Sequence, residues 1–203
     1  MSTKPLIHVV DDDGSLRSAL LRLLGAAGFE AHGYPSAGDF LTHPPPDRPG
    51  CVLLDIRMPG PSGLELQAAL ATRGVELPVI FLTAHADVAS SVRAMKAGAV
   101  DFLTKPVERD VLLDALRRAL ERDAGRRADR AEADRLRGLF ASLAPREREV
   151  FDRIVGGEIN KQIAEEIGVS ERTVKAERAQ VMAKLGVGSA AELGRLAEQL
   201  RRL

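Results

Sequence analysis

The stretch Leu6–Val10 (LIHVV), which is followed by the acidic run Asp11–Asp13, opens the pattern that decides the fold of the first half of the chain. Three further runs, Cys51–Leu54, Val79–Leu82 and Val100–Leu103, are equally short, rich in β-forming residues and without polar alternation. Such runs are typical of strands that are buried on both faces of a parallel sheet.

Helical patterns separate these runs. A weaker strand is expected at Glu30–Tyr34, followed by a short helix at Ala37–Thr42. Five strands that alternate with helices predict an α/β fold, a doubly wound five-stranded parallel sheet with right-handed crossovers. The other expected helices are Ser15–Ala27, Gly63–Arg73, a stripe through Val88, Val92 and Met95, and Val111–Leu120.

The pattern from Pro145 onward is helical only. Two helices separated by Gly168–Ser170, the second opened by a capping serine, have the form of a helix-turn-helix, so we expect a small all-α domain. The expected helices are Glu149–Val155 in a segment that Pro145 opens, Lys161–Ile167 capped by Asn160, Glu171–Leu185 capped by Ser170, and a last helix that Ser189 caps and that ends near Leu200.

Residues 121–140 join the two patterns. Strong helix formers, mostly Ala, Arg, Asp and Glu, dominate this segment, and no continuous apolar stripe spans it. We expect domains at 1–120 and 141–203, joined by an exposed, mostly helical linker over 121–140 that continues a helix from Arg109. A disordered linker is the alternative.

Composition excludes several classes of protein. The 203 residues carry 29 Lys and Arg against 29 Asp and Glu, and a single cysteine, Cys51, excludes a disulfide framework and a Cys-based zinc site. No run approaches the roughly 18 apolar residues of a spanning helix, and the start lacks a secretory signal pattern. We therefore expect a soluble, cytoplasmic protein with no membrane partner. The histidines show no metal-ligand spacing and are assigned structural or surface roles: His8, His32, His43 and His85.

Polar side chains follow four of the expected strands. Because ligands bind at the carboxyl edge of such a sheet, we expect these side chains to converge. Clustered carboxylates repel one another unless a hard cation lies among them, and Mg²⁺ prefers oxygen ligands. The residues are Asp11, Asp12 and Asp13 after the first strand, Asp55 after the third, Thr83 after the fourth, and Lys105–Pro106 after the fifth.

This set of residues suits the movement of a phosphoryl group. Asp55 would attack, Lys105 and the metal would neutralise charge, and the Thr83 hydroxyl would donate a hydrogen bond to a phosphoryl oxygen. A simpler structural role remains open for each of these residues. Asp11, Asp12, Asp13 and Asp55 could each cap a helix, Lys105 before Pro106 could lie in a surface turn, and Thr83 could cap the helix that starts near Asp87.

The first half of the chain resembles the receiver domain of two-component response regulators over residues 5 to about 120. The resemblance is carried by VVDDDGSLRSALLRLL (9–24), LLDIRMPGPSGLEL (53–66) and IFLTAHADVASSVRAMKAGAVDFLTKPV (80–107). It implies a flavodoxin/CheY-like fold, phosphorylation of Asp55 by a sensor histidine kinase, and a surface at Val88–Ala97 and Val100–Leu103 that dimerises on phosphorylation. It further implies Mg²⁺ held by Asp11, Asp12, Asp55 and the carbonyl of Arg57, phosphoryl contacts from Thr83 and Lys105, a cis Lys105–Pro106 bond, and Phe102 moving with Thr83.

The second half resembles the DNA-binding domain of the FixJ/NarL (LuxR-type helix-turn-helix) family. The stretch LAPREREVFDRIVGGEINKQIAEEIGVSERTVKAERAQVMAKLGV (143–187) carries the resemblance. It implies binding of double-stranded DNA and a structural polar network that includes Glu147. The implied DNA contacts are Lys161, Thr173, Lys175 and Arg178, with Arg172 and Lys184 as further candidates.

Two residues depart from that family pattern. Ala144 stands where a Thr or Ser usually caps the first helix, and its loss of the cap costs about 1 kcal/mol of local stability. Glu177 stands where the family often has His or another non-acidic residue, so its carboxylate would repel phosphate, accept from a cytosine or pair with a neighbouring Arg. Residues 145–203 are nearly neutral, with 11 Lys and Arg against 10 acidic residues.

Together the two halves predict a phosphorylation-controlled transcription regulator rather than an enzyme. Its expected partners are a sensor histidine kinase, double-stranded DNA, RNA polymerase and a second copy of the chain. One alternative is a helical domain that binds protein instead of DNA. Another is a Mg²⁺-dependent aspartyl-phosphate phosphatase, which normally carries D-x-D-x-T after its first strand, whereas Gly14 and Ser15 follow the aspartates here.

Overall fold

The structure, a computed structural model, describes residues 4–43, 45–84 and 87–202. The chain divides into two compact units, Met1–Arg127 and Ala128–Leu203. Among the described residues, no helix combines the length and the apolar character needed to cross a membrane. His85 lies outside the described residues.

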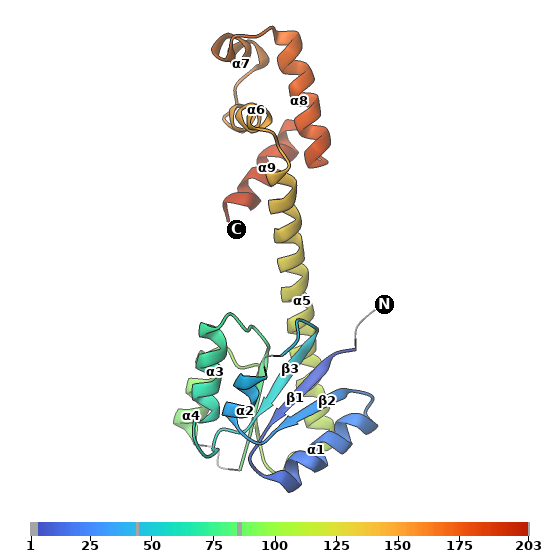
Figure 1. The fold of residues 1–203 in the computed structure, drawn as a ribbon, viewed down its shortest axis with the longest axis vertical. Helices are drawn as coiled ribbons and strands as arrows, with labels where there is room; N and C mark the ends of the chain where they lie inside the picture. Colours follow the sequence, from blue (N-terminus) through green and yellow to red (C-terminus); the bar gives the residue numbers. More distant parts are fainter. Residues whose placement is uncertain (1–3, 44, 85–86, 203) are drawn as a thin grey trace. The chain divides into compact units, whose positions relative to one another are not determined.

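The first unit is built on one parallel sheet with the strand order β2-β1-β3-β4-β5 (Figure 1). This order confirms the predicted doubly wound α/β fold class. Each strand lies within one residue of its predicted bounds. The strands are β1 (Leu6–Val10), β2 (Glu30–Tyr34), β3 (Gly50–Leu54), β4 (Val79–Thr83) and β5 (Asp101–Thr104).

Helices cover both faces of the sheet. Alternate residues of each central strand point to opposite faces, so Leu53 packs in one hydrophobic cluster and Leu54 in the other. α1 and α5 cover the first face, and α2, α3 and α4 cover the second. The bounds are α1 (Gly14–Ala26), α2 (Ala37–Thr42), α3 (Gly63–Thr72), α4 (Val88–Lys96) and α5 (Arg109–Ala141).

The second unit is helical, as predicted. After the end of α5, four helices enclose a core that includes Val150, Ile163, Val174 and Leu193. Left-handed glycines follow α7 and α8, where the absence of a Cβ permits a positive φ. The helices are α6 (Pro145–Val155), α7 (Asn160–Ile167), α8 (Glu171–Leu185) and α9 (Ala190–Arg201).

The predicted caps of the second unit are confirmed in two cases and wrong in one. Ser170 and Ser189 accept hydrogen bonds from backbone amides of the first turns of α8 and α9. Asn160 is the first residue of α7 rather than its cap. The cap position belongs to Ile159, whose amide donates to the Gln162 side chain at 2.9 Å. Gln162 satisfies an amide at the helix start, so the helix begins one residue earlier than predicted.

The segment predicted as an exposed linker is helical, but a buried residue lies toward each of its ends. Asp123 is fully buried within the first unit, and Leu136 is buried in the core of the second. Residues 128–135 are exposed apart from the half-buried Ala133. Buried partners thus hold the turns of α5 around Asp123 in the first unit, which extends to Arg127.

His8 is a buried histidine in β1. Its Nδ1 lies 3.0 Å from the Tyr34 hydroxyl, and its ring packs edge-on against Phe40. Burial, aided by the charges of His32 and Arg48, lowers the pKa of His8 to about 4. The folded protein therefore holds this imidazole neutral, which agrees with the structural role predicted for it.

Acid should destabilise the first unit through His8. Since the pKa of His8 falls from 6.5 to about 4 on folding, the stabilisation is complete above pH 6.5 and is lost as the pH falls toward 4. The loss should reach about 3 kcal/mol. Urea unfolding at pH 7.0 and 5.0 should show a smaller difference in His8→Gln than in the wild type. The exposed His43→Gln is the control, and an unchanged pH dependence in His8→Gln would contradict the assignment.

Candidate functional site

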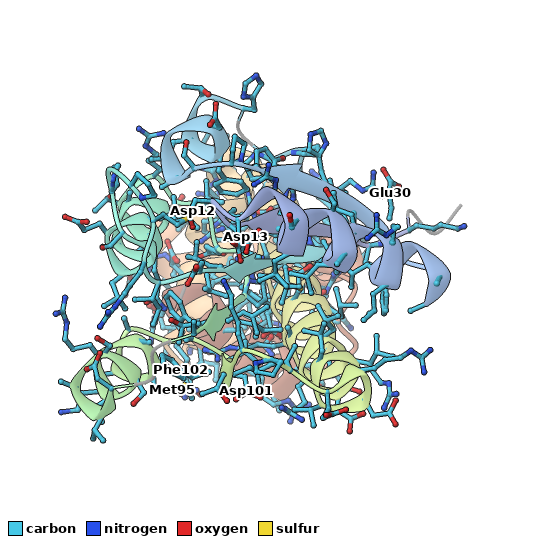
Figure 2. The ribbon with its side chains drawn as sticks, turned by 90° about the horizontal axis from the view of Figure 1, so that it is seen from below. Asp12, Asp13, Glu30, Met95, Asp101 and Phe102 are labelled. Carbon is cyan, nitrogen blue, oxygen red and sulfur yellow. The ribbon has the colours of Figure 1, made fainter. Side chains whose placement is uncertain are left out.

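Three carboxylates converge at the carboxyl edge of the sheet. Asp11, Asp12 and Asp55 can each place a carboxylate oxygen within 4.8 Å of the others. Asp11 and Asp55 are buried, whereas Asp12 is exposed. Figure 2 shows Asp12 beside Asp13, where β1 gives way to α1. The predicted convergence of these acids is therefore confirmed, and three hard oxygen donors at this spacing suit Mg²⁺.

Lys105 lies between two of these acids. Its Nζ is 2.7 Å from Asp11 Oδ2 and 2.8 Å from Asp55 Oδ2. Burial alone would lower the pKa of Lys105, but the hydrogen bonds to both carboxylates outweigh it and raise the pKa. Burial raises the pKa of Asp11, and the hydrogen bond from Lys105 only partly opposes this rise. The Lys105–Pro106 bond is cis, as predicted.

Hydrogen bonds from α1 and from the loop after β1 hold Asp11 in place. The Arg17 guanidinium donates to the Asp11 carbonyl at 2.6 Å, and the Asp13 amide donates to Asp11 Oδ1 at 3.0 Å. The Asp13 carboxylate accepts from the amides of Ser15 and Leu16, so its predicted role as a helix cap is confirmed. Sequence reasoning did not single out Arg17, because its partner is a backbone carbonyl that leaves no side-chain pattern.

The loop after β3 requires a glycine to shape the surroundings of Asp55. A Cβ at Gly63 would lie 2.1 Å from the Asp55 carbonyl oxygen, a distance that real Cβ atoms do not show. The Gly63 amide donates to the Ile56 carbonyl at 2.9 Å, and the Arg57 amide donates to Asp55 Oδ1 at 3.3 Å. Gly63 was missed as a site residue, although its place in the quoted P-S-G stretch was a signal for it.

Thr83 and Phe102 lie on neighbouring strands. Thr83 is buried at the end of β4, and its carbonyl accepts a hydrogen bond from the Lys105 amide at 2.8 Å. Asp87 caps α4 by accepting from the Ser90 amide, so the alternative role of Thr83 as that cap is wrong. Phe102 is half-buried, with its ring centroid 6.3 Å from that of Phe81.

An apolar surface lies on α4, the helix that packs beside β5. Figure 2 labels Met95 of α4 and Phe102 of β5 on this side of the first unit. The exposed fractions are 79% for Val88, 46% for Val92 and 47% for Met95. Three large apolar side chains exposed on one short helix are typical of a surface that another molecule covers.

The helix-turn-helix of the second unit exposes most of the predicted DNA contacts. Val174, Val181 and Leu185 pack inward from α8, as predicted. The exposed members of the predicted set are Lys161 on α7 and Arg172, Thr173 and Lys175 on α8.

Three polar residues of α8 contact other side chains of the domain. Lys184 Nζ lies 2.6 Å from Glu147 Oε2, and this hydrogen bond lowers the pKa of Glu147. Glu147 also accepts from the Ala144 amide, so the predicted structural polar network is confirmed. Arg178 is half-buried and donates to Asn160 Oδ1 at 3.2 Å. Glu177 Oε2 lies 3.5 Å from Arg146 Nε, which matches the predicted pairing with a neighbouring arginine.

Comparison with known proteins places both units in families. Residues 7–117 match the response regulator receiver domain, and residues 141–197 match the bacterial regulatory proteins of the luxR family. Nodulation protein W of Bradyrhizobium diazoefficiens is 44% identical over 98% of this chain and 88% of its own length. The transcriptional regulatory protein FixJ of the same species is 41% identical over 97% of this chain and 96% of its own length.

Solved structures agree with this assignment. The response regulator StyR matches with a TM-score of 0.88 and 48% identity, covering 97% of this chain and 100% of its own. Full-length FixJ from B. japonicum matches with a TM-score of 0.60 and 40% identity, covering 99% of both chains. This chain therefore belongs to the response regulators that join an N-terminal receiver domain to a C-terminal luxR-type DNA-binding domain.

Proposed function

We propose that Asp55 accepts a phosphoryl group from a sensor histidine kinase in the cytoplasm. The phosphorylated protein then dimerises and binds specific DNA, where it controls transcription together with RNA polymerase. The observation that carries this proposal is the position of Lys105, whose ammonium lies within hydrogen-bond distance of both Asp11 and Asp55 beside the third acid, Asp12.

Phosphoryl transfer would use the Asp55 carboxylate as its nucleophile. A carboxylate oxygen of Asp55 attacks the phosphorus of a phosphohistidine, the P–N bond breaks, and the imidazole nitrogen leaves with the bonding electron pair. The Lys105 ammonium, 2.8 Å from Asp55, can donate to a phosphoryl oxygen in the same region. Negative charge on the phosphoryl group would be offset by Mg²⁺ held by Asp11, Asp12, Asp55 and the carbonyl of Arg57.

The response to phosphorylation would start at the ends of β4 and β5. The new group adds about −1.5 to −2 charges and strong acceptor oxygens. Thr83 and Lys105 would bind it better in one conformation than in another, and this difference shifts the population. Phe102 would move with Thr83, and the apolar side chains of α4 would then join two copies of the chain.

In the second unit, α8 would enter the major groove. Arg172 and Lys175 on α8, with Lys161 on α7, would contact phosphates or guanines, and Thr173 would contact a phosphate. Arg178 would reach DNA only by exchanging its contact with Asn160. Lys184, which was a further candidate contact, is better placed to stabilise the domain through Glu147.

Removing Lys105 should destabilise the receiver. Lys105→Met leaves Asp11 and Asp55 without their shared cation, and we expect a loss of about 2–3 kcal/mol, because Asp11 can take up a proton and limit the cost. Thermal unfolding in EDTA and in 10-fold steps of Mg²⁺ up to about 10 mM should show partial recovery with the ion. Lys96→Met, an exposed lysine on α4, should behave like the wild type, and equal melting of all three proteins would rule out the role given to Lys105.

Phosphorylation of Asp55 should control association. Wild-type protein treated with beryllofluoride and Mg²⁺ should shift from monomer to dimer in analytical ultracentrifugation, because the mimic occupies the site of the phosphoryl group. Asp55→Ala should remain monomeric, while Asp114→Asn, which changes an exposed carboxylate on α5, should respond like the wild type. The coupling fails if Asp55→Ala and the wild type share one association state.

Lys175 should contribute to DNA binding mainly through charge. Each neutralised phosphate adds about 0.9 to the slope of log affinity against log salt, so Lys175→Ala should lower the slope by about one and weaken binding about tenfold near 0.1 M salt. A fluorescence anisotropy titration with a selected duplex and excess competitor DNA measures both. Arg22→Ala removes the same charge from α1 and should change neither. Absence of any sequence-specific retention would favour a helical domain that binds protein.

A further inference from the structure

A buried ionic cluster lies on α5, far along the sequence from the phosphoacceptor. Asp123 is fully buried, although its neighbours Arg122 and Ala124 are exposed. Its carboxylate accepts hydrogen bonds from the Gly50 amide at 3.1 Å, from Arg126 Nη2 at 2.6 Å and from Arg127 Nε at 3.0 Å. A buried carboxylate is costly unless it is paired and hydrogen-bonded, and Asp123 meets both conditions.

The Gly50 amide explains why an acceptor is needed at this position. β3 begins at Gly50, but its pairing with β4 begins only at Val52, so the first amide of β3 extends beyond its neighbour strand. A Cβ at Gly50 would lie 2.2 Å from the Leu6 carbonyl oxygen, so only glycine fits there. Asp123 therefore supplies the acceptor that β4 does not, at the amino edge of the sheet.

The two arginines connect α5 to two loops at the same edge. Arg126 Nη1 donates to Glu76 Oε2 at 2.7 Å, in the segment between α3 and β4. Arg127 donates to Asp47 Oδ1 at 2.7 Å and to the Arg48 carbonyl at 2.6 Å, in the segment before β3. Two turns of α5 that carry no apolar stripe are thus held by charge-assisted hydrogen bonds.

We propose that Asp123 is a positioning residue that locks α5 to the receiver as far as Arg127, so that the part of the helix free to move begins after Arg127. The functional consequence of this lock rests on the proposed function. The lock fixes the point at which α5 leaves the receiver, and phosphorylation can therefore bias the DNA-binding domain only while the lock holds. Without it, phosphorylation and receiver dimerisation continue, but their effect on DNA affinity is lost.

The test compares Asp123→Asn with Asp129→Asn in the full-length chain. The asparagine oxygen can still accept from Gly50 but no longer carries the charge that holds both arginines, whereas Asp129 is an exposed acid on the same helix. Hydrogen exchange in residues 121–127 should rise about tenfold in Asp123→Asn, with β1 and β3 unchanged. The ratio of DNA affinities with and without beryllofluoride should fall toward one, while dimerisation persists. Asp129→Asn should keep the exchange pattern and the affinity ratio of the wild type.

Other outcomes overturn the proposal. A lower melting temperature with an unchanged affinity ratio would make Asp123 only a structural residue, and unchanged exchange would show that no lock exists. If Asp123→Asn does not fold, Arg126→Gln, which keeps the bond between Gly50 and Asp123, should show the same change in exchange and ratio. If wild-type protein shows no beryllofluoride effect on DNA affinity, the proposed function fails, while the exchange experiment still decides whether Asp123 holds α5.

Discussion

The contact of one ammonium with two carboxylates is the interaction on which the receiver site depends. Parallel topology brings the ends of β1, β3 and β5 to one edge, and it therefore forces Asp11 and Asp55 together. Their repulsion would oppose folding if Lys105 did not lie between them at 2.7 and 2.8 Å. The same arrangement leaves Asp12 exposed beside the pair, so a cation and a phosphoryl group can reach the site from solvent.

α5 links the two edges of the sheet. It begins at Arg109, shortly after Lys105, and buries Leu112, Leu116 and Ala119 against one face of the sheet. It then places Asp123 at the amino edge, opposite the acids. A close-packed helix of this kind transmits a displacement rather than absorbing it, because its buried side chains have no empty space to move into. α5 therefore connects the acidic site at the carboxyl edge of the sheet with the ionic cluster around Asp123 at the amino edge.

Local patterns in the sequence were sufficient for the strands, the strand ends and the acids that follow them, because each depends on residues close together in the chain. They were insufficient for Arg17 and Asp123, since each of these hydrogen-bonds to a backbone group. Gly63 was missed although the P-S-G stretch was a signal for it. Asp123 was assigned to an exposed linker because no continuous apolar stripe spans residues 121–140, and its partner at Gly50, 73 residues away, is near it only in the folded chain. The start of α7 was misplaced for a smaller reason, because the Gln162 side chain accepts from the Ile159 amide and the helix therefore begins at Asn160.

The charge of the DNA-binding domain bears on why dimerisation would matter. Residues 145–203 carry a net charge near zero, and the contacts of Lys184 with Glu147 and of Arg178 with Asn160 engage two of the four cations of α8 with protein. Arg172 and Lys175 remain exposed on that helix, so a single domain would neutralise few phosphates and bind weakly at physiological salt. Two such domains would gain affinity without new contacts if α5 holds them at a spacing that lets both engage DNA at once, because the second would then bind at a high effective concentration. Weak DNA binding by the monomer is therefore the condition under which the proposed phosphorylation, acting through dimerisation, would decide whether DNA is bound.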